Sequence, residues 1–131
     1  MKKLLILLFS ILISFNSYGE WTFITKSIEG PKKGDTYYVD LVTIKENGGY
    51  VYWWYMNNYI KPDQWGDMSA KGYSQGDCGT SKYRLLSGIF YQQPMGRGGN
   101  DSYTPENPEW SYPFPNTISG ILLDYVCDYV N

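Results

Sequence analysis

Histidine is absent from this chain of 131 residues, and cysteine occurs only twice. Without an imidazole, the chain cannot form a serine–histidine–aspartate or cysteine–histidine nucleophile, and it lacks the nitrogen ligand that zinc sites use most often. Two cysteines alone also make a poor metal-binding set. We therefore predict that the protein is not an enzyme and that it needs neither a metal ion nor another cofactor.

Charge of either sign is sparse as well. The chain has 11 basic and 13 acidic residues, which give a net charge of −2. The basic residues are scattered along the sequence, so the dense cationic footprint that binds nucleic-acid phosphates is missing. We predict that nucleic acid is not a partner.

The N-terminus has the three parts of a secretory signal peptide. Lys2 and Lys3 precede an apolar stretch at residues 4–13, and Ser17 and Gly19 supply small residues at −3 and −1 of a cleavage site. The apolar stretch is short compared with the ~20 residues that a membrane-spanning helix requires. We expect the leader to be cleaved before Glu20.

Removal of residues 1–19 would leave residues 20–131, a length that suits one domain. No later segment is long and apolar enough to span a membrane, and no cysteine directly follows the apolar stretch to carry a lipid. The mature protein is thus predicted to be exported, either periplasmic or secreted, and not lipid-anchored.

An oxidising compartment favours a disulfide between Cys78 and Cys127. The two are far apart in sequence, so they lack the CxxC spacing of a redox motif. Closing so large a loop would stabilise the fold by about 4 kcal/mol on the chain-entropy account.

Strand patterns dominate the first two thirds of the mature chain. Segments that are rich in β-branched and aromatic residues, or that alternate in polarity, are separated by glycine-containing turns. These predicted strands are residues 20–25, 36–40, 50–60, 71–78 and 82–91. Residues 92–116 contain five prolines and are predicted to form a long irregular loop, with a flexible turn at 96–99 and a short strand at 110–112.

The C-terminal segment changes to a helical period. Asn116 or Thr117 can cap a helix, and the apolar residues that follow recur at spacings of three and four. We predict an α+β domain in which an antiparallel sheet of five or six strands carries a C-terminal helix on one face, tethered by the disulfide.

Aromatic residues make up 18% of the chain, which is the most informative excess. Most of them are expected to fill the core of a small sheet. Aromatic side chains on loops or weak strands are better candidates for stacking on sugars or for a protein interface. These predicted ligand-binding residues are Trp65, Tyr73, Tyr103, Trp110 and Tyr112.

The order of several short motifs resembles the surface-adhesin protein E-like family of bacterial exported proteins. The matching segments are Trp21, residues 37–40, 44–45, 51–54, Cys78, residues 83–87, 95–96, 105–110 and 125–127. The resemblance covers essentially the whole mature chain and implies an α+β domain with a disulfide-tethered helix. It also implies binding to host extracellular-matrix proteins and the capacity to form a homodimer, because the lipoprotein adhesin that gives the family its name does both. This chain departs from that lipoprotein in having no lipidation cysteine.

Two functional hypotheses follow. The first is an exported, non-enzymatic, adhesin-like module that recognises a protein or glycan partner, with an extracellular-matrix protein as one candidate. The second is a structural or accessory subunit of a cell-envelope assembly, held through an exposed sheet edge.

Overall fold

The computed structural model describes residues 20–131, so the predicted signal peptide lies outside the described residues. The strands are β1 (Trp21–Lys26), β2 (Thr36–Asp40), β3 (Lys45–Asn47), β4 (Tyr50–Asn58), β5 (Ser69–Asp77), β6 (Lys82–Gln93) and β7 (Arg97–Tyr103). The helices are η1 (Leu41–Thr43), a 3-10 turn, and α2 (Ile118–Val130). Within residues 20–131, no helix has the length and apolarity needed to cross a membrane.

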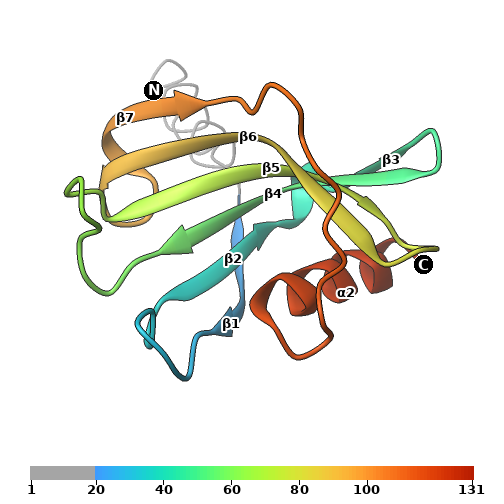
Figure 1. Ribbon diagram of the computed structural model, residues 1–131, viewed down its shortest axis with the longest axis horizontal. Helices are drawn as coiled ribbons and strands as arrows, with labels where there is room; N and C mark the ends of the chain where they lie inside the picture. The colour runs from blue at the N-terminus through green and yellow to red at the C-terminus, as the bar shows by residue number, and fades with distance from the viewer. Residues whose placement is uncertain (1–19) are drawn as a thin grey trace, which may run out of the picture.

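All seven strands form one antiparallel sheet in the order β1-β2-β4-β5-β6-β7, with β3 paired to β4 beside the main path. The sheet is curved, and α2 lies against one of its faces (Figure 1). The α+β class, the antiparallel sheet and the C-terminal helix are therefore confirmed.

The helix begins where its capping signal predicts. The Thr117 side chain accepts a hydrogen bond from the Gly120 N–H at 3.2 Å, which caps the first turn. The buried residues Leu122, Leu123 and Val126 then face the sheet, where they pack against Val51 and Trp53 of β4 and their neighbours. Burying this apolar stripe is what holds the helix to the sheet.

The predicted disulfide is confirmed between Cys78 and Cys127, whose Cα atoms lie 5.7 Å apart. Cys78 follows β5, and Cys127 lies in the last turns of α2. The bond therefore ties the β5–β6 hairpin to the helix, and the C-terminus lies close to that hairpin in Figure 1.

The prediction of an irregular loop from 92 to 116 is wrong for residues 92–93, which end β6, and for residues 97–103, which form β7. Pro94 and Pro105 bracket this strand without interrupting it, so its backbone is free to pair with β6. All seven residues of β7 are exposed, so this edge strand needs no apolar pattern. Strands are predicted from such a pattern, so the sequence carries no signal for β7. The flexible turn predicted at 96–99 is accordingly reduced to Gly96, with Gly98 and Gly99 inside the strand.

Small residues of β5 let the aromatic side chains of β4 pack under the helix. A Cβ atom on Gly76 would come within 2.9 Å of both the Trp53 ring and the Leu123 side chain, and one on Gly72 would overlap the Tyr55 ring. Ser74 lies between the two glycines and is paired with Trp53. Residues 72, 74 and 76 thus form a small-residue stripe that the rings of β4 overlie.

This stripe gives a test of the fold. Gly76→Ala should lower the free energy of unfolding by about 1–3 kcal/mol, because the added methyl group must displace Trp53 or Leu123 from a packed core. Gly79→Ala is the matched control, since a Cβ there meets only the Asp77 side chain at an ordinary 3.4 Å. Urea denaturation of the two variants should separate them, and equal stabilities would contradict the packing described.

Candidate functional site

The face of the sheet opposite the helix carries a second set of aromatic side chains. Successive side chains of a strand point to opposite faces, so Trp53 faces the helix while Trp54 faces away from it. The strand register pairs Trp54 with Tyr73 and Tyr52 with Gln75 on this helix-free face. No helix of the described chain covers these residues.

The rings on this face stack against one another across the strands. Tyr73 lies between Trp54 and Tyr52, with ring centres 5.1 Å and 6.1 Å away. Such pairs stabilise a sheet beyond the area that they bury. They also hold the rings in place without covering their outer edges.

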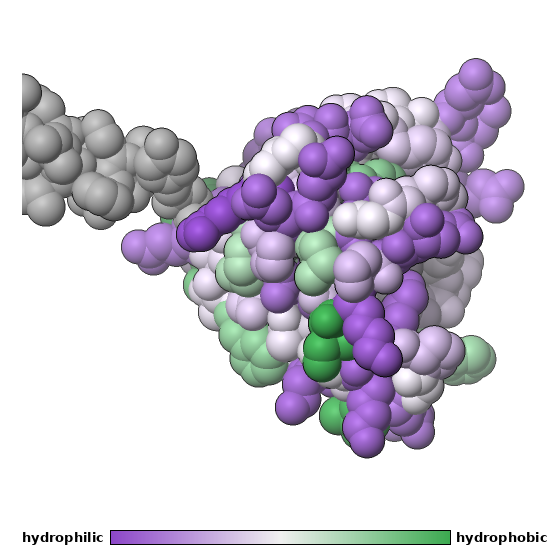
Figure 2. Space-filling view, turned by 90° about the vertical axis from the view of Figure 1, so that its left-hand side faces the viewer, coloured by the Kyte–Doolittle hydropathy of each residue, from purple (hydrophilic) through white to green (hydrophobic). Residues whose placement is uncertain are grey.

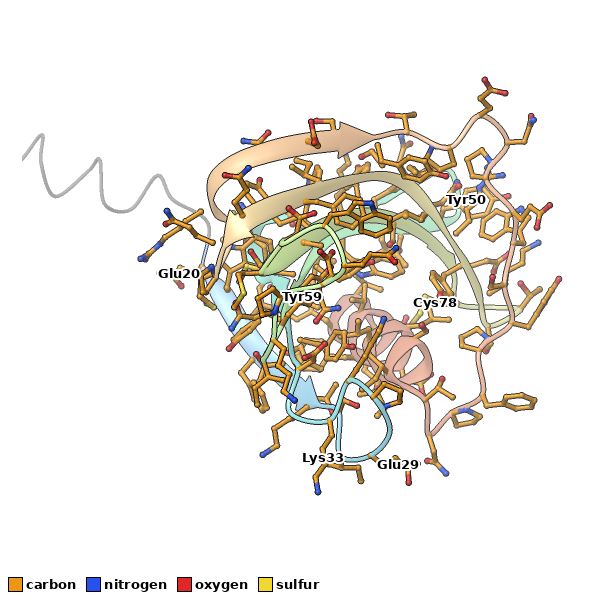
Figure 3. All side chains as sticks on the ribbon, turned by 60° about the vertical axis from the view of Figure 1, so that its left-hand side comes forward. Glu20, Glu29, Lys33, Tyr50, Tyr59 and Cys78 are labelled. Carbon is orange, nitrogen blue, oxygen red and sulfur yellow. A yellow bond between two sulfur atoms is a disulfide. The ribbon has the colours of Figure 1, made fainter. Side chains whose placement is uncertain are left out.

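A second stack forms where the segment after β7 passes the end of the sheet. Trp110 stacks on Tyr50 of β4 with ring centres 5.7 Å apart. The neighbouring Ser111 is held by two backbone hydrogen bonds with Tyr83 of β6, at 2.9 and 3.0 Å. Tyr50 is labelled in Figure 3, beside this crossing segment. The loop is thereby fixed as part of the helix-free face.

Basic side chains lie over the rings at this end. Lys82 Nζ is 4.5 Å and the Arg84 guanidinium carbon 4.4 Å from the centre of the Trp110 ring. Arg84 Nε donates to Gln75 Oε1 at 2.7 Å, and Gln75 Nε2 donates to the Tyr52 hydroxyl at 3.0 Å. This chain of contacts connects the Trp110 stack to the central stack.

A third cation lies at the other end of the same face. Lys71 Nζ is 5.3 Å from the Trp21 ring centre and 5.0 Å from that of Tyr91. Together with Trp54 and Asp40, these residues line a shallow hollow of about 300 Å³. Aromatic walls around a cation form a hollow that suits a sugar ring or a side chain bearing a carboxylate.

We name this set of residues the aromatic array. Its members share the helix-free face or, in the case of Trp110, the loop that joins that face. The array consists of the rings of Trp21, Tyr50, Tyr52, Trp54, Tyr73, Tyr91 and Trp110 with the cations Lys71, Lys82 and Arg84.

One border of the array is closed by the β6–β7 turn. The Gly96 N–H donates to Ser69 Oγ and the Met95 N–H to Asn58 Oδ1, each at 2.8 Å. Met56 is fully buried below this turn even though it is on the helix-free face. The remaining part of the array is left open to a partner.

The structure brings two of the five sequence-predicted binding residues into the array, namely Tyr73 and Trp110. The other three lie apart from it. Trp65 is 75% exposed in the β4–β5 connection, Tyr112 is 67% exposed beyond Trp110, and Tyr103 is exposed at the end of β7. A binding role for any of the five stays a prediction.

Eight of the ten array residues were not predicted from the sequence, among them Trp21, Trp54 and Lys71. Residues 50–55 carry bulky groups on both faces of the strand, so alternation alone does not show which of them face the helix. The pairing of β4 with β5 shows which side chains face the helix. In β5, Lys71 and Tyr73 alternate with Gly72 and the other small residues of the stripe, which lie on the helix side.

Figure 2 shows the end of the molecule that carries the β1–β2 and β4–β5 turns as mostly hydrophilic, with apolar residues in small separate patches. A separate hollow of about 470 Å³, lined among others by Ile60, Trp65 and Phe90, lies between these turns. Within residues 20–131, no three metal-binding side chains converge on a common point. The array is the strongest candidate site, and its chemistry is stacking combined with cation contacts.

Tyrosines on and beside the helix-covered face have altered acidity. Burial raises the pKa of Tyr55 to about 12, with smaller contributions from the neighbouring phenols of Tyr83 and Tyr37. The pKa of Tyr59 is also raised to about 12, mainly by burial and then by nearby carboxylates, of which Asp63 is the first. Ionising these phenols in the folded protein is therefore unfavourable.

Comparisons with known proteins agree with this fold. The family model described as Surface-adhesin protein E matches residues 21–128. A crystal structure of Haemophilus influenzae protein E (form II) is 17% identical, with a TM-score of 0.61, covering 83% of this chain and 90% of that chain. A second structure of the same protein is 16% identical, with a TM-score of 0.58, covering 81% and 83%. A search of curated proteins found no match.

The raised tyrosine pKa values predict a loss of stability at alkaline pH. A phenol with a pKa of 10 in the unfolded chain and about 12 in the fold stabilises the fold fully below pH 10, and this stabilisation is lost as the pH rises through about 12. Tyr55→Phe should therefore reduce the alkaline loss of unfolding free energy by on the order of 2 kcal/mol. Denaturation curves between about pH 8 and 12 measure this, and an unchanged slope in the variant would contradict it.

Proposed function

Because the chain belongs to the surface-adhesin protein E family, we propose that it is an exported, non-enzymatic adhesin whose aromatic array recognises a protein or glycan partner. Extracellular-matrix proteins are the candidate partners that the family suggests. Export without a lipid anchor, to the periplasm or the medium, is part of the same proposal.

The observation that carries the proposal is the clustering of aromatic rings and cations on the helix-free face. Tryptophan, tyrosine and arginine are the residue types that contribute most binding energy at protein interfaces. Rings that are already stacked lose little conformational entropy when a partner binds, so the array is preorganised. The exposed flanks of these rings also suit the apolar faces of sugars.

The positive charge of the array indicates which chemical groups a partner surface would carry. The full chain has a net charge of −2, yet Lys71, Lys82 and Arg84 all lie on this one face. Asp40, the acidic neighbour in the hollow, uses its carboxylate to accept a hydrogen bond from the Val42 N–H at 3.1 Å. Complementarity therefore favours a partner surface that carries carboxylate or sulfate groups.

The proposal predicts that array tryptophans contribute more to binding than equally large exposed ones. Trp54→Ala and Trp110→Ala should each weaken binding to a matrix-protein and glycan panel by at least ~10-fold, since buried aromatic anchors dominate such interfaces. Biolayer interferometry measures the affinities, and melting curves show that each variant remains folded.

Trp65→Ala is the matched control, because Trp65 is exposed but outside the array. It should bind within about twofold of the unmodified protein. If Trp65→Ala loses binding while the array variants keep it, the site lies at the β4–β5 connection and the assignment to the array is wrong.

A second candidate function, an accessory subunit of an envelope assembly, is favoured by β7. This strand is at the edge of the sheet, and all seven of its residues are exposed, so its outer backbone groups are available to another strand.

This alternative predicts that an arginine-selective dicarbonyl crosslinker will capture the protein in a defined complex in cell envelopes through Arg97, the basic residue of β7. Mass spectrometry locates the linked residues. A protein that stays monomeric and uncrosslinked in those envelopes would count against the accessory role and leave the adhesin proposal unaffected.

A further inference from the structure

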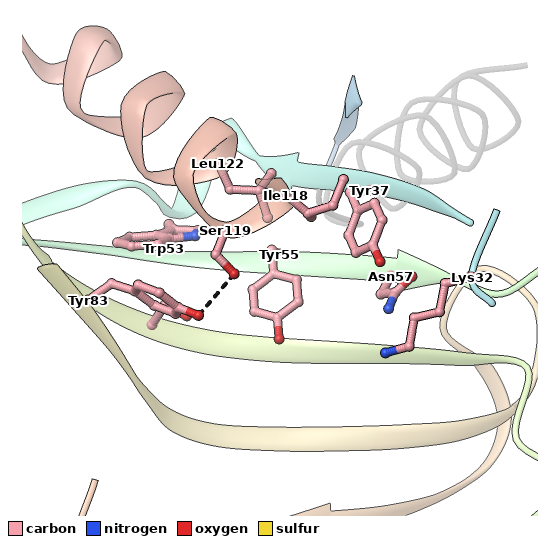
Figure 4. A pocket seen from close by; sticks show the side chains of 10 residues that line it. Lys32, Tyr37, Trp53, Tyr55, Asn57, Tyr83, Ile118, Ser119 and Leu122 are labelled. Atoms are coloured by element: carbon pink, nitrogen blue, oxygen red, sulfur yellow. Dashed lines mark hydrogen bonds between the residues drawn. The ribbon is translucent and has the colours of Figure 1, made fainter. Parts of the chain in front are cut away.

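A cavity of about 230 Å³ lies between the first turn of α2 and the sheet, on the face opposite the aromatic array. Its walls come from β2, β4, β5, β6, α2 and the β1–β2 turn, so segments far apart in the sequence enclose it. Figure 4 shows Trp53 and Tyr83 at one end, Asn57 and Lys32 at the other, and Tyr55 between them.

Three buried polar atoms of residues that line this cavity have no hydrogen-bond partner. They are Trp53 Nε1, Ser74 Oγ and Asn57 Oδ1, and they make up the complete set of such side-chain atoms within residues 20–131. Trp53 is only 2% and Ser74 only 1% exposed. Buried polar groups are nearly always hydrogen-bonded, so the presence of all three on residues that line one cavity marks a place where a bound molecule would complete the bonding.

The small-residue stripe explains why space remains here. Gly72 and Ser74 supply little volume beneath the helix, and Tyr55 lies flat across Gly72. One wall is fixed by the Tyr83 hydroxyl, which donates to Ser119 Oγ of α2 at 2.9 Å. The cavity is therefore already formed in the folded protein.

The two ends of the cavity suit different chemical groups of a ligand. Trp53 Nε1 can only donate a hydrogen bond, and the Ser74 hydroxyl beside it can also donate, so this end calls for an acceptor oxygen. At the other end, Lys32 is the sole ionised side chain among the lining residues. The nearby carboxylate of Asp35 is outside the lining and accepts from the Ile60 N–H at 2.9 Å. Asn57 Oδ1, the unpaired atom at this end, is an acceptor, so the three N–H groups of the Lys32 ammonium would have to serve both Asn57 and the ligand. An anion that accepts from Lys32 suits this end.

The middle of the cavity is apolar and aromatic. The rings of Tyr37 and Tyr55 face Ile118 and Leu122 of the helix across it. Burial raises the pKa of both phenols above the ordinary value of tyrosine, with Asp35 adding to the effect on Tyr37, so both phenols are uncharged hydrogen-bonding groups in the cavity. A flat ring or a short hydrocarbon segment suits such walls.

We propose that this cavity binds a small organic carboxylate with a hydroxyl or carbonyl oxygen at its far end. The carboxylate pairs with Lys32, the ring or chain packs between the tyrosines and the helix, and the distal oxygen accepts from Trp53 Nε1 and Ser74 Oγ. The site lies across the sheet from the array and does not depend on the adhesin role.

The probe for this test is 4-hydroxyphenylacetate, added to the protein while the indole N–H signal of Trp53 is followed by NMR. It should shift that signal with saturation. Phenylacetate, which lacks the distal oxygen, should bind at least ~10-fold more weakly, because two buried donors then stay unpaired. Tyramine, in which an amine replaces the carboxylate, should leave the Trp53 signal unmoved.

Two lysine variants complete the test. Lys32→Gln should weaken binding by about fivefold or more. Lys33→Gln should match the unmodified protein, because Lys33 is equally exposed but does not line the cavity. Ser74→Ala should weaken the binding of 4-hydroxyphenylacetate but not that of phenylacetate. A merely structural role of Ser74 would weaken the binding of both acids. The proposal would be overturned if the two acids bound with equal affinity, if the two lysine variants had equal effects, or if none of the probes moved the Trp53 signal. The cavity would then hold water alone.

Discussion

The packing of α2 against one face of the sheet is the constraint on which the rest of the structure depends. It divides the aromatic side chains of β4 into two sets, because Trp53 must face the helix and Trp54 must then face away from it. The Cys78–Cys127 bond holds the helix to the β5–β6 hairpin at one end of the sheet. One face of the seven-stranded sheet is therefore packed against α2, while the other is covered only by the β6–β7 turn and the segment that carries Trp110.

The aromatic side chains pack differently on the two faces of the sheet. Under the helix, the small residues of β5 make room for Trp53 and Tyr55, and the imperfect fit leaves a polar-lined cavity. On the other face, outside the parts covered by the β6–β7 turn and the segment that carries Trp110, rings stack on rings and cations lie over them. The same pairing of β4 with β5 thus produces both features, and a shift of register by one residue would remove both.

Much of this architecture could be predicted from the sequence, and the reasons for the exceptions are physical. The helix, its Thr117 cap and the disulfide follow from local spacing and from the expected compartment. β7 could not be predicted, because an edge strand with every residue exposed carries no apolar pattern. The array could be predicted only in part, since Trp21 and Lys71 meet through pairings of distant strands. Only Tyr73 and Trp110 were identified, and they stood out because a weak strand or a loop carries them.

Under the proposed function, the helix-free face meets the partner while the helix-covered face does not. The five tryptophans of the chain report on this directly, because Trp21, Trp54 and Trp110 belong to the array, Trp53 faces the helix and Trp65 is in the β4–β5 connection. Their indole N–H signals can be recorded by NMR with and without a matrix protein or glycan that binds. We expect the three array signals to broaden or shift while those of Trp53 and Trp65 stay in place. Changes confined to Trp53 or Trp65 would contradict the proposed function.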